Sequence, residues 1–240
     1  MLSERKKALR GFRHWTPRYI YNRLKLVAYE RAHPSAPWLT HKMVEFLESW
    51  LKPGHQGFEW GSGRSTIWFA ERIGSLVSVE HNPDWYGQVS AELKRKGLKN
   101  VDYHLHQDED DYCSVADNFS PASFDFCLID GVARDRCALL ALSLVRPGGL
   151  LIADNCNWYL PTDSRSPYSR KACEGAYTED WAVFWKQVED WRHVWTTNGV
   201  FDTALWVKPS GIREGNQLIG QNSTHRGFSL KIKDQYREQI

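Results

Sequence analysis

The sequence lacks the features of a disulfide-rich or zinc-binding protein. It has five cysteines among 240 residues, an odd number, and no two of them form a Cys-x-x-Cys pair. Paired cysteines at regular spacings are the usual sign of a disulfide framework or of a zinc site. We therefore expect reduced thiols in a cytoplasmic protein.

Long apolar runs and a strong charge of one sign are also missing. No stretch approaches the roughly 20 apolar residues that a membrane-spanning helix needs. No apolar segment follows the basic start of the chain, so we expect no secretory signal. A formal net charge of +2 is small for a protein that binds nucleic acid, and we expect no such partner.

Length and composition predict one main domain with appendages. A chain of 240 residues with 42% hydrophobic residues is long enough to bury a full core. We expect a basic arm over residues 1–37, the main domain over residues 38–208 and a polar tail over residues 209–240.

The most informative stretch is a glycine turn within residues 57–66. A short apolar strand leads into Gly61 and Gly63, and a helix is expected to begin near Ser65. Because glycine has no Cβ, the backbone can turn sharply there and approach a ligand closely. The free N–H groups at the start of the helix then face a polar group of that ligand.

A second strand, over residues 76–80, ends in the carboxylate of Glu80 about 20 residues after the turn. This spacing is typical of a strand–helix–strand unit in which Glu80 accepts hydrogen bonds from both hydroxyls of a ribose. His81 follows directly and is expected on the ribose or adenine side. The pattern therefore predicts an adenosine-containing cofactor.

The motif Glu59-x-Gly61-x-Gly63, followed by Glu80, resembles the class I S-adenosylmethionine-dependent methyltransferases. Ser65 stands where many members of that family have glycine. The resemblance implies that the chain is a methyltransferase acting on an oxygen of a small-molecule or glycan acceptor. It also implies a set of residues that bind S-adenosylmethionine: Glu59, Gly61, Ser62, Gly63, Glu80, His81 and Asp130.

The remaining chain predicts the rest of an α/β fold. Further apolar strands are expected over residues 101–105, 124–130 and 150–155, with helices between them. Two strands around Asn198-Gly199 match the antiparallel edge pair of the resembling family. We therefore expect a Rossmann-like, doubly wound and mostly parallel seven-stranded sheet with an antiparallel edge pair and a basic N-terminal helical arm.

Polar side chains end several of these strands. Ligands of parallel sheets collect at the carboxyl ends of the strands, so we expect these side chains to meet at one edge: Glu59, Glu80, Asp130, Asp154 and Asn155. Three segments between elements are predicted to be irregular. They are a polar loop at residues 108–111, a tight turn at residues 146–149, and a substrate loop at residues 156–177 in which Trp158 and Tyr159 stack on a ring.

Asp130 followed by Asp154-Asn155 resembles the magnesium-dependent O-methyltransferases. That resemblance implies that these three oxygen ligands hold Mg²⁺, which binds and acidifies the acceptor hydroxyl. The lysine base of that family is missing, because Gly131 to Arg134 follow Asp130. The proton acceptor therefore stays open among Asp130, Asp154 and His81.

The start of the chain permits two interpretations. Residues 1–31 carry nine basic residues against two acidic ones, with aromatic and aliphatic residues between them. The segment either packs on the domain with its charges in solvent, or forms a surface helix that contacts an anionic membrane or a lipid-linked substrate. Pro17 interrupts the apolar stripe and favours the first interpretation.

Two other functions compete with methyl transfer. A nicotinamide-dependent oxidoreductase also uses a glycine turn and an acid such as Glu80, but Thr66 occupies the place of its third glycine. A cofactor-binding scaffold without catalysis would have the same fold. The sequence gives no indication of the oligomeric state.

Overall fold

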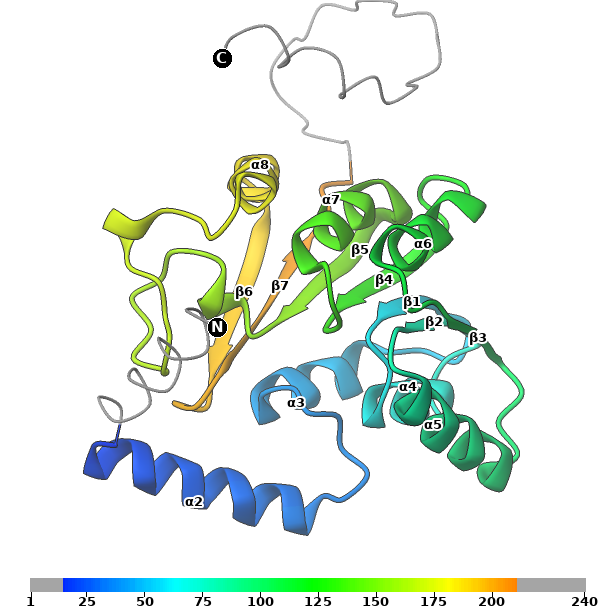
Figure 1. The fold of residues 1–240 in the computed structure, drawn as a ribbon, viewed down its shortest axis with the longest axis horizontal. Helices are drawn as coiled ribbons and strands as arrows, with labels where there is room; N and C mark the ends of the chain where they lie inside the picture. Colours follow the sequence, from blue (N-terminus) through cyan, green and yellow to red (C-terminus); the bar gives the residue numbers. More distant parts are fainter. Residues whose placement is uncertain (1–14, 211–240) are drawn as a thin grey trace, which may run out of the picture. The chain divides into compact units, whose positions relative to one another are not determined.

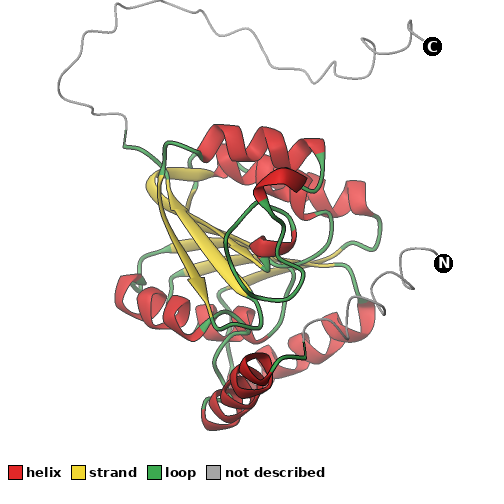
Figure 2. Cartoon of the chain, turned by 90° about the vertical axis from the view of Figure 1, so that its left-hand side faces the viewer, coloured by secondary structure: helices red, strands yellow, loops and turns green. Residues whose placement is uncertain are grey.

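The computed structural model of the protein describes residues 15–210 as a seven-stranded sheet with helices on both faces (Figures 1 and 2). The strand order is β3-β2-β1-β4-β5-β7-β6, and only β7 runs against its neighbours. The predicted fold class is confirmed. The strands are β1 Gln56–Trp60, β2 Ser75–Glu80, β3 Val101–Leu105, β4 Phe124–Ile129, β5 Val145–Asp154, β6 Arg192–Thr197 and β7 Asp202–Val207.

The helices cover the sheet in two groups. Helices α6, α7 and α8 lie over one face, and α3, α4 and α5 lie over the other (Figure 1). The α-helices are α2 Pro17–Ala32, α3 His41–Trp50, α4 Arg64–Ala70, α5 Pro83–Lys96, α6 Glu109–Ser114, α7 Arg134–Leu144 and α8 Glu179–Val188. Short 3₁₀ helices are η2 Val115–Asn118, η3 Cys156–Trp158 and η4 Ala172–Glu174.

The central strands alternate their side chains between the two faces. Phe58 and Trp60 of β1 pack under α7 and α8, whereas Phe126 of β4 packs on the side of α3 and α4. All three side chains have no exposed surface. Successive side chains of a strand point to opposite faces, so a strand covered on both sides needs apolar residues throughout.

Two predicted irregular segments were wrong. Residues 109–114 form helix α6, because Asp108 caps it by accepting hydrogen bonds from the N–H groups of Asp110 and Asp111. Residues 146–149 lie within strand β5, where the pairing with β4 shifts register after Phe124 and Gly148 has a φ of 77°. The turn residues therefore make a β-bulge and do not end the strand.

The basic arm contains one helix in its described part, α2, which spans Pro17–Ala32. Leu26 is buried, and the side chain of Asn22 lies against Gly199 in the turn between β6 and β7. Residues 1–14 of the arm and residues 211–240 of the tail lie outside the described part of the chain. Within residues 15–210, none of the helices combines the length and apolar composition needed to cross a membrane.

The packing of β1 against β4 generates a stability prediction. A Cβ on Gly57 would overlap the ring of Phe126, which is fully buried and lies 4.6 Å, centroid to centroid, from Phe69. Gly57→Ala should therefore lower the free energy of unfolding by about 1–3 kcal/mol, as overpacking of a core does. Urea unfolding measures this change.

Gly54→Ala is the matched control, because no atom lies within 4 Å of a Cβ added there. We expect its free energy of unfolding to stay within about 0.5 kcal/mol of the parent protein. Equal unfolding midpoints for the two variants would show that the Phe126 ring can move aside.

Candidate functional site

A cavity of about 410 Å³ lies at the carboxyl ends of β1, β2 and β4. The strand order reverses between β1 and β4, and ligands of open α/β sheets bind at such a point. The cavity is lined by Gly61, Ser62, Glu80, His81, Asn82, Asp84, Trp85, Gln88, Asp130 and Gly131.

The glycine turn brings the ends of β1 and β4 into close contact. Gly61 has a φ of 93°, and a Cβ there would lie 2.5 Å from the backbone nitrogen of Gly131. Only glycine combines that backbone conformation with such an approach. The turn therefore forms the floor of the cavity where the sequence predicted a bound nucleoside.

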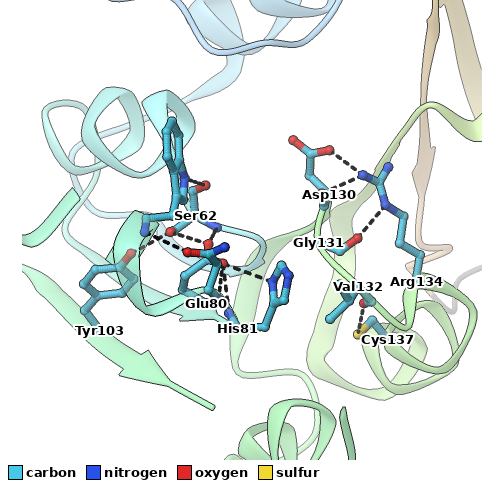
Figure 3. A network of polar contacts seen from close by, with 11 residues as sticks. Ser62, Glu80, His81, Tyr103, Asp130, Gly131, Val132, Arg134 and Cys137 are labelled. Carbon is cyan, nitrogen blue, oxygen red and sulfur yellow. Dashed lines mark hydrogen bonds and ion pairs between the residues drawn. The ribbon is translucent and has the colours of Figure 1, made fainter. Parts of the chain in front are cut away.

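Glu80 is directed at the glycine turn and is only 3% exposed. Its Oε2 accepts hydrogen bonds from the N–H (3.0 Å) and Oγ (2.7 Å) of Ser62, and its Oε1 accepts from the N–H groups of His81 (2.9 Å) and Asn82 (2.8 Å). Figure 3 shows Glu80 and Ser62 on one side of the site and Asp130 on the other. The carboxylate thus joins the ends of β1 and β2.

Two aromatic residues that the sequence interpretation missed fix Ser62 further. The Ser62 hydroxyl lies 2.5 Å from the Tyr103 hydroxyl, and the indole N–H of Trp85 donates to the Ser62 carbonyl at 2.7 Å. Trp85 is the third residue of α5, and Tyr103 lies on β3. The proline that starts α5 indicated where Trp85 would lie, but nothing local in the sequence indicated the contact of Tyr103.

Glu59 lies beneath the turn and does not line the cavity. It has no exposed surface, and its Oε1 accepts hydrogen bonds from Thr66 and, at 2.8 Å, from Ser78. Thr66 in turn accepts the N–H of Gly63 at 2.9 Å. Burial raises the pKa of Glu59 to about 7, although the hydrogen bonds from Thr66 and Ser78 oppose the shift. Glu59 therefore holds the loop from below.

Asp130 lines the cavity, and Arg134 holds it there. The Arg134 guanidinium donates to the Asp130 carboxylate at 3.0 Å and to the Asp130 carbonyl at 2.6 Å. Its remaining N–H groups donate to the carbonyls of Gly131 (2.8 Å) and Asp154 (2.7 Å) and to Asn155 Oδ1 (3.4 Å). Burial raises the pKa of Asp130, and Arg134 opposes the shift.

The predicted metal ligands surround this guanidinium. Asp154 is 4% exposed and accepts a hydrogen bond from Thr203 at 2.6 Å, so it does not line the cavity. Asn155 and Asp130 both face Arg134, whose five N–H donors all have acceptors. Mg²⁺ needs octahedral oxygen ligands at about 2.0–2.1 Å, and a cation already occupies this place. The set does not fit a divalent ion.

Within residues 15–210, no group of three or more His, Cys, Asp or Glu side chains is arranged to hold a metal. His81 lies beside the cavity, where its Nδ1 is 3.0 Å from Glu80 Oε1 and its side chain is 41% exposed. Its position fits the predicted cofactor side of the site.

The predicted substrate loop is anchored by one buried amide. Asn157 donates to the Pro167 carbonyl at 3.1 Å and to the Ser169 hydroxyl at 3.0 Å, and it accepts the N–H of Asp202 at 3.3 Å. Tyr159 stacks on Trp181 with centroids 5.2 Å apart, so one face of its ring is used in packing. Trp158 is 38% exposed and remains available to a ligand.

The buried carboxyl of Glu59 predicts a pH-dependent stability. Its pKa of about 7 lies above its ordinary value of 4.5, so ionisation opposes folding. The free-energy cost of ionising Glu59 in the folded protein is absent below about pH 4.5, grows between pH 4.5 and 7, and reaches its full size above pH 7. A shift of this size corresponds to about 3 kcal/mol.

Glu59→Gln keeps an acceptor for Thr66 and Ser78 but cannot ionise. We expect the variant to gain about 2–3 kcal/mol relative to the parent protein on going from pH 5 to pH 8. Urea unfolding of both proteins at the two pH values measures the difference. Parallel pH profiles would show that Glu59 does not titrate in this range.

Comparison with known proteins identifies the domain. Residues 58–156, which include the glycine turn, Glu80, Asp130 and Asp154, match the model of a methyltransferase domain. No curated protein is similar enough in sequence to match the chain.

Solved structures of methyltransferases are similar to the chain. A candidate O-methyltransferase from Klebsiella pneumoniae has a TM-score of 0.51 at 21% identity, over 75% of this chain and 87% of its own. The O-methyltransferase TomG from Streptomyces achromogenes, solved with S-adenosylmethionine, has a TM-score of 0.49 at 20% identity. The match covers 65% of this chain and 74% of TomG. A candidate rRNA methylase from Clostridium thermocellum has a TM-score of 0.49 at 14% identity, and the match covers 69% of this chain and 93% of the methylase. Residues 58–156 therefore match a methyltransferase domain, the chain has the Rossmann-like fold of such enzymes, and the resemblance seen in its sequence is confirmed.

Proposed function

We propose that the protein transfers the methyl group of S-adenosylmethionine to a hydroxyl oxygen of a small-molecule or glycan acceptor. The observation that carries this proposal is the charge of the cavity. Glu80, Asp84 and Asp130 line it, and among the described residues 15–210 no lysine or arginine does. A lining of carboxylates favours a cationic ligand, and the sulfonium of S-adenosylmethionine is a cation.

The same lining disfavours a nicotinamide dinucleotide, which carries a negatively charged pyrophosphate. Dinucleotide sites offer free loop N–H groups to that pyrophosphate. Here the N–H of Ser62 donates to Glu80 and the N–H of Gly63 donates to Thr66. Two N–H groups of the loop are therefore already in use and do not bind an anion.

Binding of the nucleoside would use the cavity wall formed by β2. Glu80 is the acceptor for the ribose hydroxyls in this proposal, and they would replace the Ser62 hydroxyl, which is itself an O–H donor at 2.7 Å. His81, Asn82 and Trp85 lie on the same side of the cavity and would contact the rest of the nucleoside.

Asp130 is the carboxylate that we assign to the acceptor side. It lines the cavity opposite Glu80, and Arg134 fixes one of its oxygens at 3.0 Å while the other is not used by that contact. A carboxylate with a raised pKa is suited to accept the proton of a hydroxyl as its oxygen attacks the methyl carbon. Asp154 is hydrogen-bonded to Thr203 away from the cavity and has no such role in this proposal.

Calorimetry with S-adenosylhomocysteine tests the cofactor. We expect binding with one ligand per chain, and we expect Glu80→Gln to weaken it about 10- to 100-fold, because a charge-assisted hydrogen bond contributes about 1.5–3 kcal/mol. Glu92→Gln, on the exposed side of α5, is the control and should bind as the parent protein does. Binding of NAD, without binding of S-adenosylhomocysteine, would support the assignment as an oxidoreductase instead.

Turnover with a library of hydroxyl acceptors tests the chemistry. Asp130→Asn should lower kcat about 10²- to 10⁴-fold, the usual contribution of a general base. EDTA should leave the turnover of the parent protein unchanged, because Arg134 occupies the place of a metal. Activity that EDTA abolishes and Mg²⁺ restores would contradict this assignment, and binding without turnover of any acceptor would favour a scaffold.

A further inference from the structure

Helix α2 has two apolar faces, and only one is packed on the domain. Leu26 is buried and Asn22 lies against Gly199, which defines the inner face. Ile20 and Leu24, one helical turn apart, are 42% and 65% exposed, and Tyr21 beside them is 61% exposed. Trp15, just before the helix, is 67% exposed, but its ring lies edge-on to Tyr19 and it is not on the outer face. The outer face therefore carries an exposed apolar strip, defined here by Ile20, Tyr21 and Leu24.

Basic side chains flank the outer apolar strip. Helix α2 carries four basic residues against one acidic residue, Glu30. Lys25 lies 5.5 Å from the centroid of the Tyr21 ring, at the margin of the strip. Within residues 15–210 none of the four pairs with a carboxylate, and they are Arg18, Arg23, Lys25 and Arg31.

The outer apolar strip lies near the edge of the sheet that holds the cavity. Strand β5 ends at Asp154, which pairs with Thr203 near the start of β7. The turn between β6 and β7 is therefore at the carboxyl edge, and Asn22 of α2 packs on Gly199 in that turn. Figure 1 shows α2, in blue, beyond the end of the β6–β7 pair.

We infer that α2 binds an anionic lipid surface through the outer apolar strip, and so turns the carboxyl edge of the sheet toward that surface. Aromatic and aliphatic side chains enter the boundary between headgroups and acyl chains, and flanking lysine and arginine side chains bind anionic headgroups. A second copy of the chain is a poorer occupant, because two such helices would bring like charges together.

This inference goes beyond methyl transfer and is tested without turnover. The full chain is mixed with vesicles of phosphatidylglycerol and phosphatidylcholine, or of phosphatidylcholine alone, and floated on a density gradient. We expect flotation only with the anionic vesicles and release at about 1 M salt, where the Debye length falls to about 3 Å. The double variant Ile20→Glu, Leu24→Glu should reduce the partition coefficient at least about tenfold.

Val183→Glu, Val194→Glu is the matched control. Both valines are exposed to a similar degree, 45% and 41%, and the substitutions add the same charge away from α2. This control should float as the parent protein does, and the thermal midpoints of both double variants confirm that they fold.

Equal flotation of the α2 variant and the parent protein would overturn the inference, as would equal binding to neutral vesicles. If the parent protein does not float but elutes as a dimer that the α2 variant converts to a monomer, the occupant is a second copy and the inference is wrong. Loss of flotation together with normal binding of S-adenosylhomocysteine would support it and leave the proposed function untouched.

Discussion

Buried carboxylates at the ends of strands are the constraint on which this structure depends. Glu59, Glu80 and Asp154 are each less than 5% exposed, and they end or nearly end three of the parallel strands. A buried carboxylate is costly unless donors satisfy it, so each must recruit N–H or O–H groups from neighbouring segments. The donors to Glu80 come from the loops that form the cavity, whereas those to Glu59 and Asp154 come from neighbouring helices and strands.

Each carboxylate orders a different part of the site. Glu80 binds the glycine turn and the start of α5, and Glu59 binds Thr66 of α4 from below. Asp130 is held by Arg134, which also binds the backbone at the end of β5. Glu80 thereby joins the ends of β1 and β2, and Arg134 joins the ends of β4 and β5. Transfer between two substrates requires that such groups be held in fixed positions.

The guanidinium of Arg134 changes the chemistry that the acids can perform. The same acids that resemble a magnesium site in sequence contact a permanent monocation with all five donors in use. Such a cation stabilises the backbone of the edge and the charge of Asp130, but it leaves no open coordination position. In the proposed reaction the proton acceptor is therefore a side chain, Asp130.

The sequence alone determined the succession of strands and helices along the chain, the glycine turn and the place of Glu80 at the end of a strand, because these depend on local periodicity, on the need for glycine at Gly61 and on short spacings. It missed α6, the bulge in β5 and the roles of Trp85 and Tyr103. From their positions at strand ends, it also predicted that Glu59 and Asp154 lie in the site, but neither residue lines the cavity. Only the tertiary structure decided which acids face the cavity and that Arg134 lies among the predicted metal ligands, since both depend on contacts between segments far apart in the chain, which no local pattern encodes.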